Sequence, residues 1–367
     1  MPKKNDDTNE SRLDKITEAA EEIAKHQTVA VPPVKTNARN DKAVGVDIGT
    51  SKIVFAENGD DGMTFYSQTN AFIEVDYSKF TERIMNENNI LHHKVDNALV
   101  VYGDGAEIFA NMLNAETRRP MRKGLLNPSE ARALDIIKGI LDDLVKTTAP
   151  RTPQLCFSIP GAPENAETDI IYHEAILKRH LDQKGYCVKS INEGQAVIFS
   201  ELENENFSGI GISAGGGMCN VCLSFLSVPL LSYSITKGGD YIDDAVSSVT
   251  GEVSTRVRDV KENELDLRKR PKNDIEDALH IYYDDLIKTL VTSLNENIGR
   301  TSKIPKVEQP VPIVLSGGTV MPPGFKERFE FFMDRGTFPI PINGVRIADD
   351  PLTATARGSL IAAMYES

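Results

Sequence analysis

The chain has 367 residues, a length that predicts two domains with a substantial hydrophobic core. Hydrophobic residues make up 40% of it and charged residues 26%, which excludes a collagen-like or wholly disordered chain. The 41 basic and 54 acidic residues give a net charge of −13, so binding to nucleic acid is disfavoured. The sequence lacks a membrane-spanning apolar run, a signal peptide and a disulfide framework, and we therefore expect a cytoplasmic protein with reduced thiols.

Residues 1–41 are predicted to form a polar tail that is disordered or partly helical. The tail is rich in Lys, Asp, Asn, Glu and Thr, and it ends in a segment with two prolines that resists packing. Apolar residues recur at helical spacing at Leu13, Ile16, Ala20 and Ile23. Two interpretations stay open, a leader without a partner and a helix that docks on a partner protein. The apolar face is small, so membrane association is the weaker expectation.

The first half of the chain is predicted to open with a β-hairpin. Apolar and β-branched residues flank Gly49, Thr50 and Ser51, so residues 43–56 predict a strand, a tight turn and a second strand. Helical and strand patterns then alternate, with helices at 135–145 and 172–181 and strands at 153–159 and 186–191. This alternation is typical of an α/β domain.

The second half repeats this plan. Residues 209–225 again predict a strand, a glycine turn and a strand. Helices are predicted at 239–249, 274–298 and 324–333, with a strand at 311–315 before the last of them. Because a similar hairpin opens each half, we expect two similar α/β domains with a ligand site between them.

Three glycine-bearing turns are the strongest chemical signal, and they lie at residues 47–52, 213–220 and 316–319. Glycines allow backbone N–H groups to approach an anion closely, and the hydroxyl groups and Lys52 add further donors. Two such turns facing each other would clamp a polyphosphate. A single glycine turn is common in hairpins, so the prediction depends on finding three of them in this order.

Three other kinds of site are disfavoured. The sequence has no G-x-x-x-x-G-K-[ST] motif, so it lacks the signature of a P-loop nucleotide-hydrolysing enzyme. Gly209, Gly211 and Ala214 match a relaxed dinucleotide-binding motif, but a strand follows where that motif requires a helix. Cys219 and Cys222 supply only two of the four ligands of a structural zinc site, and residues three apart on a strand point to opposite faces.

Six segments together resemble the ATPase core shared by actin, sugar kinases and heat-shock chaperones. They are residues 46–51, 191–197, 215–217, 236–243, 314–319 and 348–358. Within this superfamily the chain is most similar to bacterial actins of the MreB and MamK type, over residues 43–365 or so. The resemblance implies an α/β fold with two similar actin-like, ribonuclease H-like domains, each a mixed sheet flanked by helices, around a nucleotide cleft.

The resemblance also implies a division of the chain. Domain I would comprise residues 42–191 and 346–367, with a small subdomain at about 67–97. Domain II would comprise residues 192–345, with a small subdomain at about 239–284.

The resemblance implies that the chain binds ATP or ADP and Mg²⁺. It also implies a role in binding or catalysis for each residue that matches a position of the family motifs. Asp47 would hold Mg²⁺ through water, and Glu193 would position or polarise the attacking water. The phosphate-binding positions would be Gly49, Thr50, Ser51, Lys52, Ser213, Gly215, Gly216 and Gly217. Gly317 and Gly318 would leave room for the adenosine, and Glu252 and Arg256 would border its ribose and base.

One position departs from the family pattern. The second phosphate motif normally begins with an aspartate and carries threonines after its glycines, whereas this chain has Ser213 and then Met218, Cys219 and Asn220. A serine carries no charge to balance Mg²⁺. Because Asp47 and Glu193 are present, we expect a slow ATPase.

The resemblance implies a cytoskeletal protein that binds ATP, hydrolyses it slowly and assembles with copies of itself into filaments. An ATP-binding scaffold of the same fold with little or no hydrolysis is the alternative, because of Ser213. A small-molecule kinase is disfavoured, because such kinases usually carry larger insertions.

Overall fold

The computed structural model describes residues 43–59, 62–113, 115–146, 153–164, 170–301, 310–336 and 338–365. The helix expected at Leu13 to Ile23 lies outside these residues. Within the described part, no helix is both long enough and apolar enough to cross a membrane.

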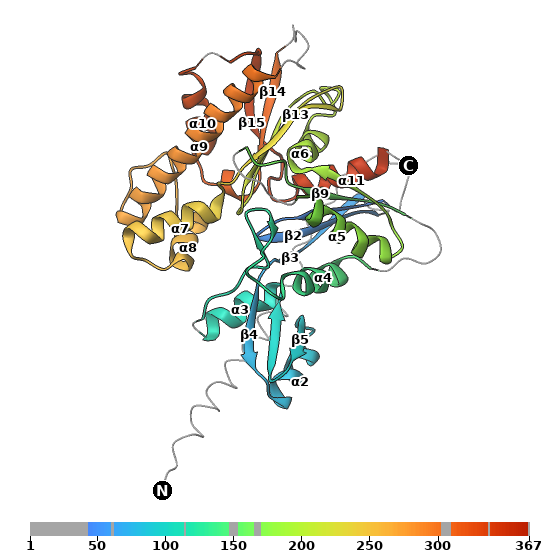
Figure 1. The fold of residues 1–367 in the computed structure, drawn as a ribbon. Helices are drawn as coiled ribbons and strands as arrows, with labels where there is room; N and C mark the ends of the chain where they lie inside the picture. Colours follow the sequence, from blue (N-terminus) through green and yellow to red (C-terminus); the bar gives the residue numbers. More distant parts are fainter. Residues whose placement is uncertain are drawn as a thin grey trace.

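Two five-stranded sheets organise the fold (Figure 1). The first sheet has the order β10–β9–β1–β2–β3, with β1 (Val44–Ile48), β2 (Lys52–Gly59), β3 (Gly62–Thr69), β9 (Gln154–Ile159) and β10 (Cys187–Asn192). The second sheet has the order β13–β12–β11–β14–β15, with β11 (Gly209–Ala214), β12 (Cys219–Phe225), β13 (Val228–Ile235), β14 (Val311–Ser316) and β15 (Ile342–Ile347).

The two sheets have the same topology. In each, the first three strands pair antiparallel as a meander, and the last two add in parallel beside the first strand. The expected fold class is therefore confirmed, as is the repetition of one plan in both halves. The ends of the predicted strands and helices lie within about three residues of their ends in the structure.

Outer helices cover one face of each sheet. On the first sheet they are α4 (Ala133–Leu144) and α5 (Ile170–Gln183), and on the second α7 (Gly239–Thr250), α9 (Asp274–Arg300) and α10 (Phe325–Met333). The apolar residues of these helices recur every three or four positions, as Ile136, Ile137, Ile140 and Leu141 do in α4, so each helix buries one face against the strands.

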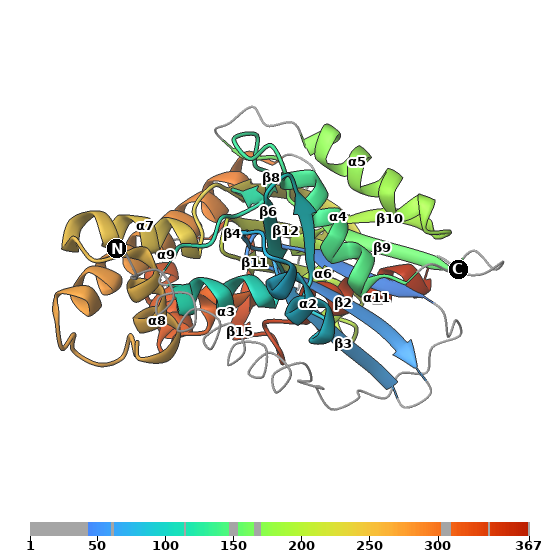
Figure 2. The ribbon, with the colours of Figure 1, turned by 90° about the horizontal axis from the view of Figure 1, so that it is seen from below.

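Smaller elements project from this framework. Between β3 and α4 the chain forms a small unit with its own apolar core. It contains a three-stranded sheet of β4 (Phe72–Asp76), β5 (His92–Val95) and β6 (Ala98–Tyr102), and two helices, α2 (Lys79–Glu87) and α3 (Asp104–Leu113). A short hairpin of β7 (Met121–Arg122) and β8 (Leu125–Leu126) follows it. In the second half, α8 (Ser254–Asn263) packs with α7 and α9, and η1 (Gly318–Val320) follows β14. Figure 2 shows α3 and α8 near each other, although they come from different halves of the chain.

Two inner helices join the sheets, α6 (Glu193–Glu201) and α11 (Ala354–Tyr365). The two helices approach each other so closely that a Cβ on Gly358 would overlap the carbonyl oxygen of Ala196. A Cβ on Gly45 of β1 would likewise overlap the backbone of α11 at Leu360. The contact between the two halves therefore depends on positions without a side chain.

A buried charge fixes the far end of α6. The Glu201 side chain is only 1% exposed, and its Oε2 accepts a hydrogen bond of 2.6 Å from Nη1 of Arg346 on β15. The guanidinium of Arg357 on α11 lies 3.9 Å from the other carboxylate oxygen. This carboxylate thus connects α6 to the second sheet and to α11.

Substitution Gly358→Ala is expected to lower the free energy of unfolding by about 1–3 kcal/mol, because a methyl group cannot fit between α11 and the Ala196 carbonyl. Gly299→Ala in α9 is the matched control, since the nearest atom to its Cβ lies at 3.7 Å and alanine favours the helix. Urea denaturation measures both. Equal stability of the two variants would contradict this role of the α6–α11 contact.

Candidate functional site

The first glycine turn connects β1 to β2. The amide of Gly49 donates to the Lys52 carbonyl at 3.0 Å, and Nδ2 of Asn70 donates to the Gly49 carbonyl at 2.9 Å. Thr50 is buried and Ser51 half-buried, whereas Lys52 is exposed at the start of β2. The turn is therefore held by its own hairpin and by an asparagine from the end of β3.

The second glycine turn connects β11 to β12 in the other sheet. The carbonyl of Gly215 accepts from the amide of Gly239 at 3.0 Å and from Oγ1 of Thr319 at 2.9 Å, and the carbonyl of Gly216 accepts from the amide of Asp240 at 2.9 Å. The first turn of α7 thus holds the carbonyl side of this loop. Within the described residues, the amides of Gly216 and Gly217 donate to no protein acceptor, so they are available to an anion.

The two turns meet face to face. A Cβ on Gly216 would overlap Oγ of Ser51, and a Cβ on Gly217 would overlap Oγ1 of Thr50. The structure therefore brings together four of the expected phosphate-binding residues, two from each half.

Asp47 and Glu193 lie behind these turns. Oδ1 of Asp47 accepts a hydrogen bond of 2.6 Å from Oγ of Ser158, which in turn accepts from the Ile48 amide at 3.1 Å. Glu193 is the first residue of α6, and the Asn192 side chain caps this helix by accepting from two of its first amides. Oε2 of Glu193 accepts a hydrogen bond of 3.0 Å from Oγ of Ser213.

Burial makes both carboxylates harder to ionise, and the charge of Asp47 adds to this effect at Glu193. Burial raises the pKa of Asp47 to about 6, against a lowering by the Ser158 hydrogen bond. Burial and the neighbouring charge of Asp47 raise the pKa of Glu193 to about 8, while the Ser213 hydrogen bond lowers it. A cation between or beside them would offset this repulsion.

The site fits a bound divalent cation in its donor chemistry. Carboxylate and amide oxygens are the ligands that Mg²⁺ accepts, and Oδ1 of Asn70, whose Nδ2 holds the first glycine turn, is buried without a hydrogen-bond partner. No group of three His, Cys, Asp or Glu side chains in the described part of the chain forms a complete metal site. Phosphate oxygens and water would therefore supply the remaining ligands around Asp47.

The structure explains what Ser213 does in place of the expected aspartate. Its hydroxyl donates to Glu193, whereas an aspartate at this position would add a third negative charge beside Asp47 and Glu193. Serine therefore keeps Glu193 hydrogen-bonded while it reduces the negative charge of the site.

The third glycine turn lies beside the second. Ser316, at the end of β14, pairs with Ser213, and the Gly317 amide donates to the Pro351 carbonyl at 2.9 Å. A Cβ on Gly317 would overlap the backbone of Ala214, whereas the nearest atom to a Cβ on Gly318 lies at 3.7 Å. Gly317 thus serves strand packing, and Gly318 borders more open space.

Glu252 and Arg256 lie further from the turns. Both are exposed, and the Arg256 guanidinium pairs with Asp259 and Glu264 rather than with any residue of the glycine turns. The residues of α8 that face inward include Lys261, whose Nζ donates to the Gly239 carbonyl at 3.1 Å and pairs with buried Asp243. The inward position of Lys261 could have been predicted from the helical period of α8, because Val257 and Val260 mark the buried face of this helix and Lys261 lies on the same face.

A segment that we call the arm, residues 119–126, also belongs to the site; it contains the β7–β8 hairpin. The Gly124 amide donates to Oγ1 of Thr50 at 3.0 Å, and a Cβ on Gly217 would lie 2.7 Å from this same amide nitrogen. Nη1 of Arg119 donates to the Ser51 carbonyl at 3.1 Å. Sequence reasoning did not identify the arm; its one signal was Lys123-Gly124, a pair suited to a tight hairpin turn.

Cys219 and Cys222 lie on β12, and both are buried as free thiols. Burial raises the pKa of each thiol to about 12, so neither is a reactive thiolate at neutral pH.

A model of the protein family described as Volactin matches residues 42–363. No curated protein matches the chain.

Solved structures with the same fold include filament proteins. A MamK double helical filament has 19% identity and a TM-score of 0.64, covering 87% of this chain and 98% of that chain. MreB5 of Spiroplasma citri bound to AMPPNP has 16% identity and a TM-score of 0.60, covering 87% and 94%. The ethanolamine utilization protein EutJ from Carboxydothermus hydrogenoformans has 15% identity and a TM-score of 0.53, covering 96% and 98%. At these identities the similarity shows the fold, and it confirms the actin-like architecture of the MreB and MamK type.

Glu193→Gln is expected to weaken the pH dependence of stability in the nucleotide-free protein. Because the folded state raises the Glu193 pKa to about 8, it holds this proton more tightly than the unfolded chain. Stability is therefore highest below the unfolded pKa of about 4.5 and is lost as the pH rises toward about 8. Glutamine removes this loss.

Thermal unfolding between about pH 5.5 and about pH 8.5 measures this effect. The Tm of the glutamine variant should fall less than that of the unchanged chain, whereas exposed Glu252→Gln should follow the unchanged chain. Parallel curves for all three proteins would contradict the assigned pKa of Glu193.

Proposed function

Because the chain belongs to the Volactin family and has the actin-like fold, we propose that it is a cytoskeletal protein that binds ATP between its two glycine turns, hydrolyses it slowly and assembles into filaments. The observation that supports this most directly is the meeting of Thr50 and Ser51 from one sheet with Gly216 and Gly217 from the other, in front of Asp47 and Glu193. Each sheet contributes half of the site.

The residues of the turns are suited to a nucleoside triphosphate. The free amides of Gly216 and Gly217 supply hydrogen-bond donors to phosphate oxygens, and the Thr50 and Ser51 hydroxyls lie opposite them. MreB5 of Spiroplasma citri has been solved with AMPPNP and with ADP, and a non-polymerising MamK mutant with AMPPNP. We expect adenine nucleotides to bind the corresponding turns here.

Mg²⁺ would supply positive charge that neutralises the phosphates. Asp47 would hold it, and Ser158 fixes the Asp47 carboxylate through the 2.6 Å hydrogen bond. Glu193, held by Ser213 at 3.0 Å, would accept a hydrogen bond from the attacking water and orient it.

Slow hydrolysis follows from the same geometry. Glu193 is an effective acceptor only when ionised, and burial favours its protonated form near neutral pH. Ser213 adds no charge to hold the cation. An ATP-binding scaffold with negligible turnover is the second candidate, and Ser213 is the observation that favours it.

Assembly is proposed from the fold. MamK forms a double helical filament, and this chain covers 98% of that MamK chain. A nucleotide held by both turns would favour one arrangement of the two sheets, and loss of its terminal phosphate would weaken that preference. The nucleotide state would thereby control assembly, and we expect the filaments to form in the cytoplasm.

Glu193→Ala is expected to lower phosphate release from Mg-ATP by at least about tenfold, because the water loses its acceptor. Binding of ADP should change little, and exposed Glu205→Ala serves as the control for a removed carboxylate. Steady-state phosphate release and calorimetry measure the two properties. Turnover by the unchanged chain that equals the Glu193→Ala rate would remove the catalytic role of Glu193 and favour the scaffold.

Gly217→Val is expected to abolish nucleotide binding and nucleotide-dependent pelleting, because its side chain would overlap Thr50 and the Gly124 backbone. Gly59→Val, at an exposed strand end where the nearest atom to a Cβ lies at 3.8 Å, is the control. High-speed sedimentation and electron microscopy with Mg-ATP provide the measurement. A strictly monomeric unchanged chain at high concentration would contradict filament formation.

A further inference from the structure

The arm brings a cation to the junction of the glycine turns. Nη1 of Arg119 donates to the carbonyl of Ser51 at 3.1 Å, so its guanidinium lies against the first turn. In the described part of the chain, Arg119 is the only Arg or Lys whose side chain is hydrogen-bonded to residues 49–51 or 215–217.

Arg119 has no carboxylate partner at ion-pair distance among the described residues. Burial lowers its pKa, and the nearby charge of Arg258 adds to this effect, while the charges of Asp240, Glu107 and Glu262 raise it by smaller amounts. An arginine stays protonated in proteins, so this half-buried positive charge is only partly balanced. An anion beside it would complete the balance.

The surroundings of Arg119 identify where that anion would lie. Asp240 begins α7, and its amide holds the Gly216 carbonyl. Arg119 therefore lies against the first turn and within electrostatic range of the helix that holds the second turn, whose Gly216 and Gly217 amides are free. A phosphate group matches this combination, because a guanidinium binds phosphate oxygens through a planar pair of N–H donors.

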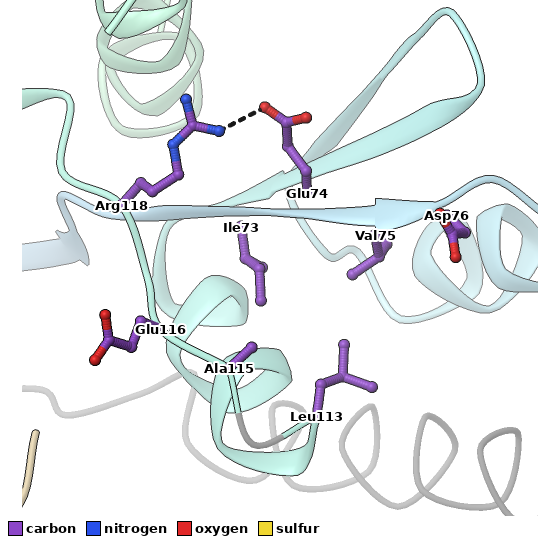
Figure 3. A pocket seen from close by; sticks show the side chains of 8 residues that line it. All are labelled: Ile73, Glu74, Val75, Asp76, Leu113, Ala115, Glu116 and Arg118. Atoms are coloured by element: carbon purple, nitrogen blue, oxygen red, sulfur yellow. Dashed lines mark hydrogen bonds and ion pairs between the residues drawn. The ribbon is translucent and has the colours of Figure 1, made fainter. Parts of the chain in front are cut away.

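The neighbouring arginine shows that this placement is specific. Arg118 instead points toward Glu74, and its Nη1 pairs with this carboxylate at 2.8 Å beside a separate pocket of about 370 Å³ (Figure 3). It also pairs with Glu130 and lies over the Phe72 ring at 4.7 Å. Of these two adjacent arginines, only Arg118 forms ion pairs with carboxylates of the described residues.

We propose that Arg119 binds the terminal phosphate of the nucleoside triphosphate and thereby distinguishes the triphosphate from the diphosphate. This inference rests on the proposed function, and it adds a residue of the arm to the two glycine turns. The Ser51 carbonyl orients the guanidinium. Because Ser213 supplies no carboxylate to hold Mg²⁺, the Arg119 guanidinium would provide part of the positive charge that neutralises the phosphates.

Calorimetric titration of the full chain with AMPPNP and with ADP, each with Mg²⁺, tests the proposal. Arg119→Gln should weaken AMPPNP binding by at least about tenfold and ADP binding by less than about twofold. Arg119→Lys keeps the charge but not the planar donors, so its affinity for AMPPNP should lie between that of the unchanged chain and that of Arg119→Gln. Arg118→Gln is the matched control and should bind both nucleotides as the unchanged chain does, with circular dichroism confirming the fold of each variant.

The outcomes separate the two proposals. Equal weakening of AMPPNP and ADP by Arg119→Gln, or no weakening of either, overturns the assignment of the terminal phosphate while nucleotide binding stands. If the unchanged chain binds neither nucleotide nor inorganic tripolyphosphate, both proposals fail.

Discussion

The close contact between α6 and α11 is the constraint on which the rest of the structure depends. Each helix packs on one sheet and on the other helix, and Gly358 and Gly45 permit the backbones to approach. Because the two sheets have the same topology, this contact places corresponding hairpins opposite each other. The junction of the two glycine turns is therefore a result of the packing of the sheets, and neither sheet could form it alone.

That arrangement also explains the electrostatics of the site. Asp47 belongs to the first sheet and Glu193 to the helix that packs on the second, so joining the halves brings two carboxylates into a buried space. The raised pKa values express the cost of this placement without a cation. Ser158 and Ser213 each donate one hydrogen bond, which orients the carboxylates without neutralising them.

Much of this could be predicted from the sequence, because the signals were local. The two hairpins, the alternation of helices and strands and the turns around Gly49 and Gly216 all follow from periodicity and glycine placement. The arm was missed because Arg119 and Gly124 reach the turns through contacts some 70 residues apart in the chain, which no short motif records. Glu252 and Arg256 were chosen by resemblance, whereas the burial pattern of α8 marks Lys261, whose ammonium donates to the Gly239 carbonyl next to the second turn.

Glu201 gives α6 a second fixed point. Its carboxylate is tied to Arg346 and lies beside Arg357, while Glu193, at the other end of the helix, lies among the site residues. At about 1.5 Å per residue, the two carboxylates are separated by roughly 12 Å along the axis. A rigid-body rotation that kept the Glu201 contacts would pivot there, so its displacement would grow along α6 and be larger at the glycine turns. A small change in the angle between the sheets would then be transmitted along the helix and would change the spacing of the phosphate-binding groups.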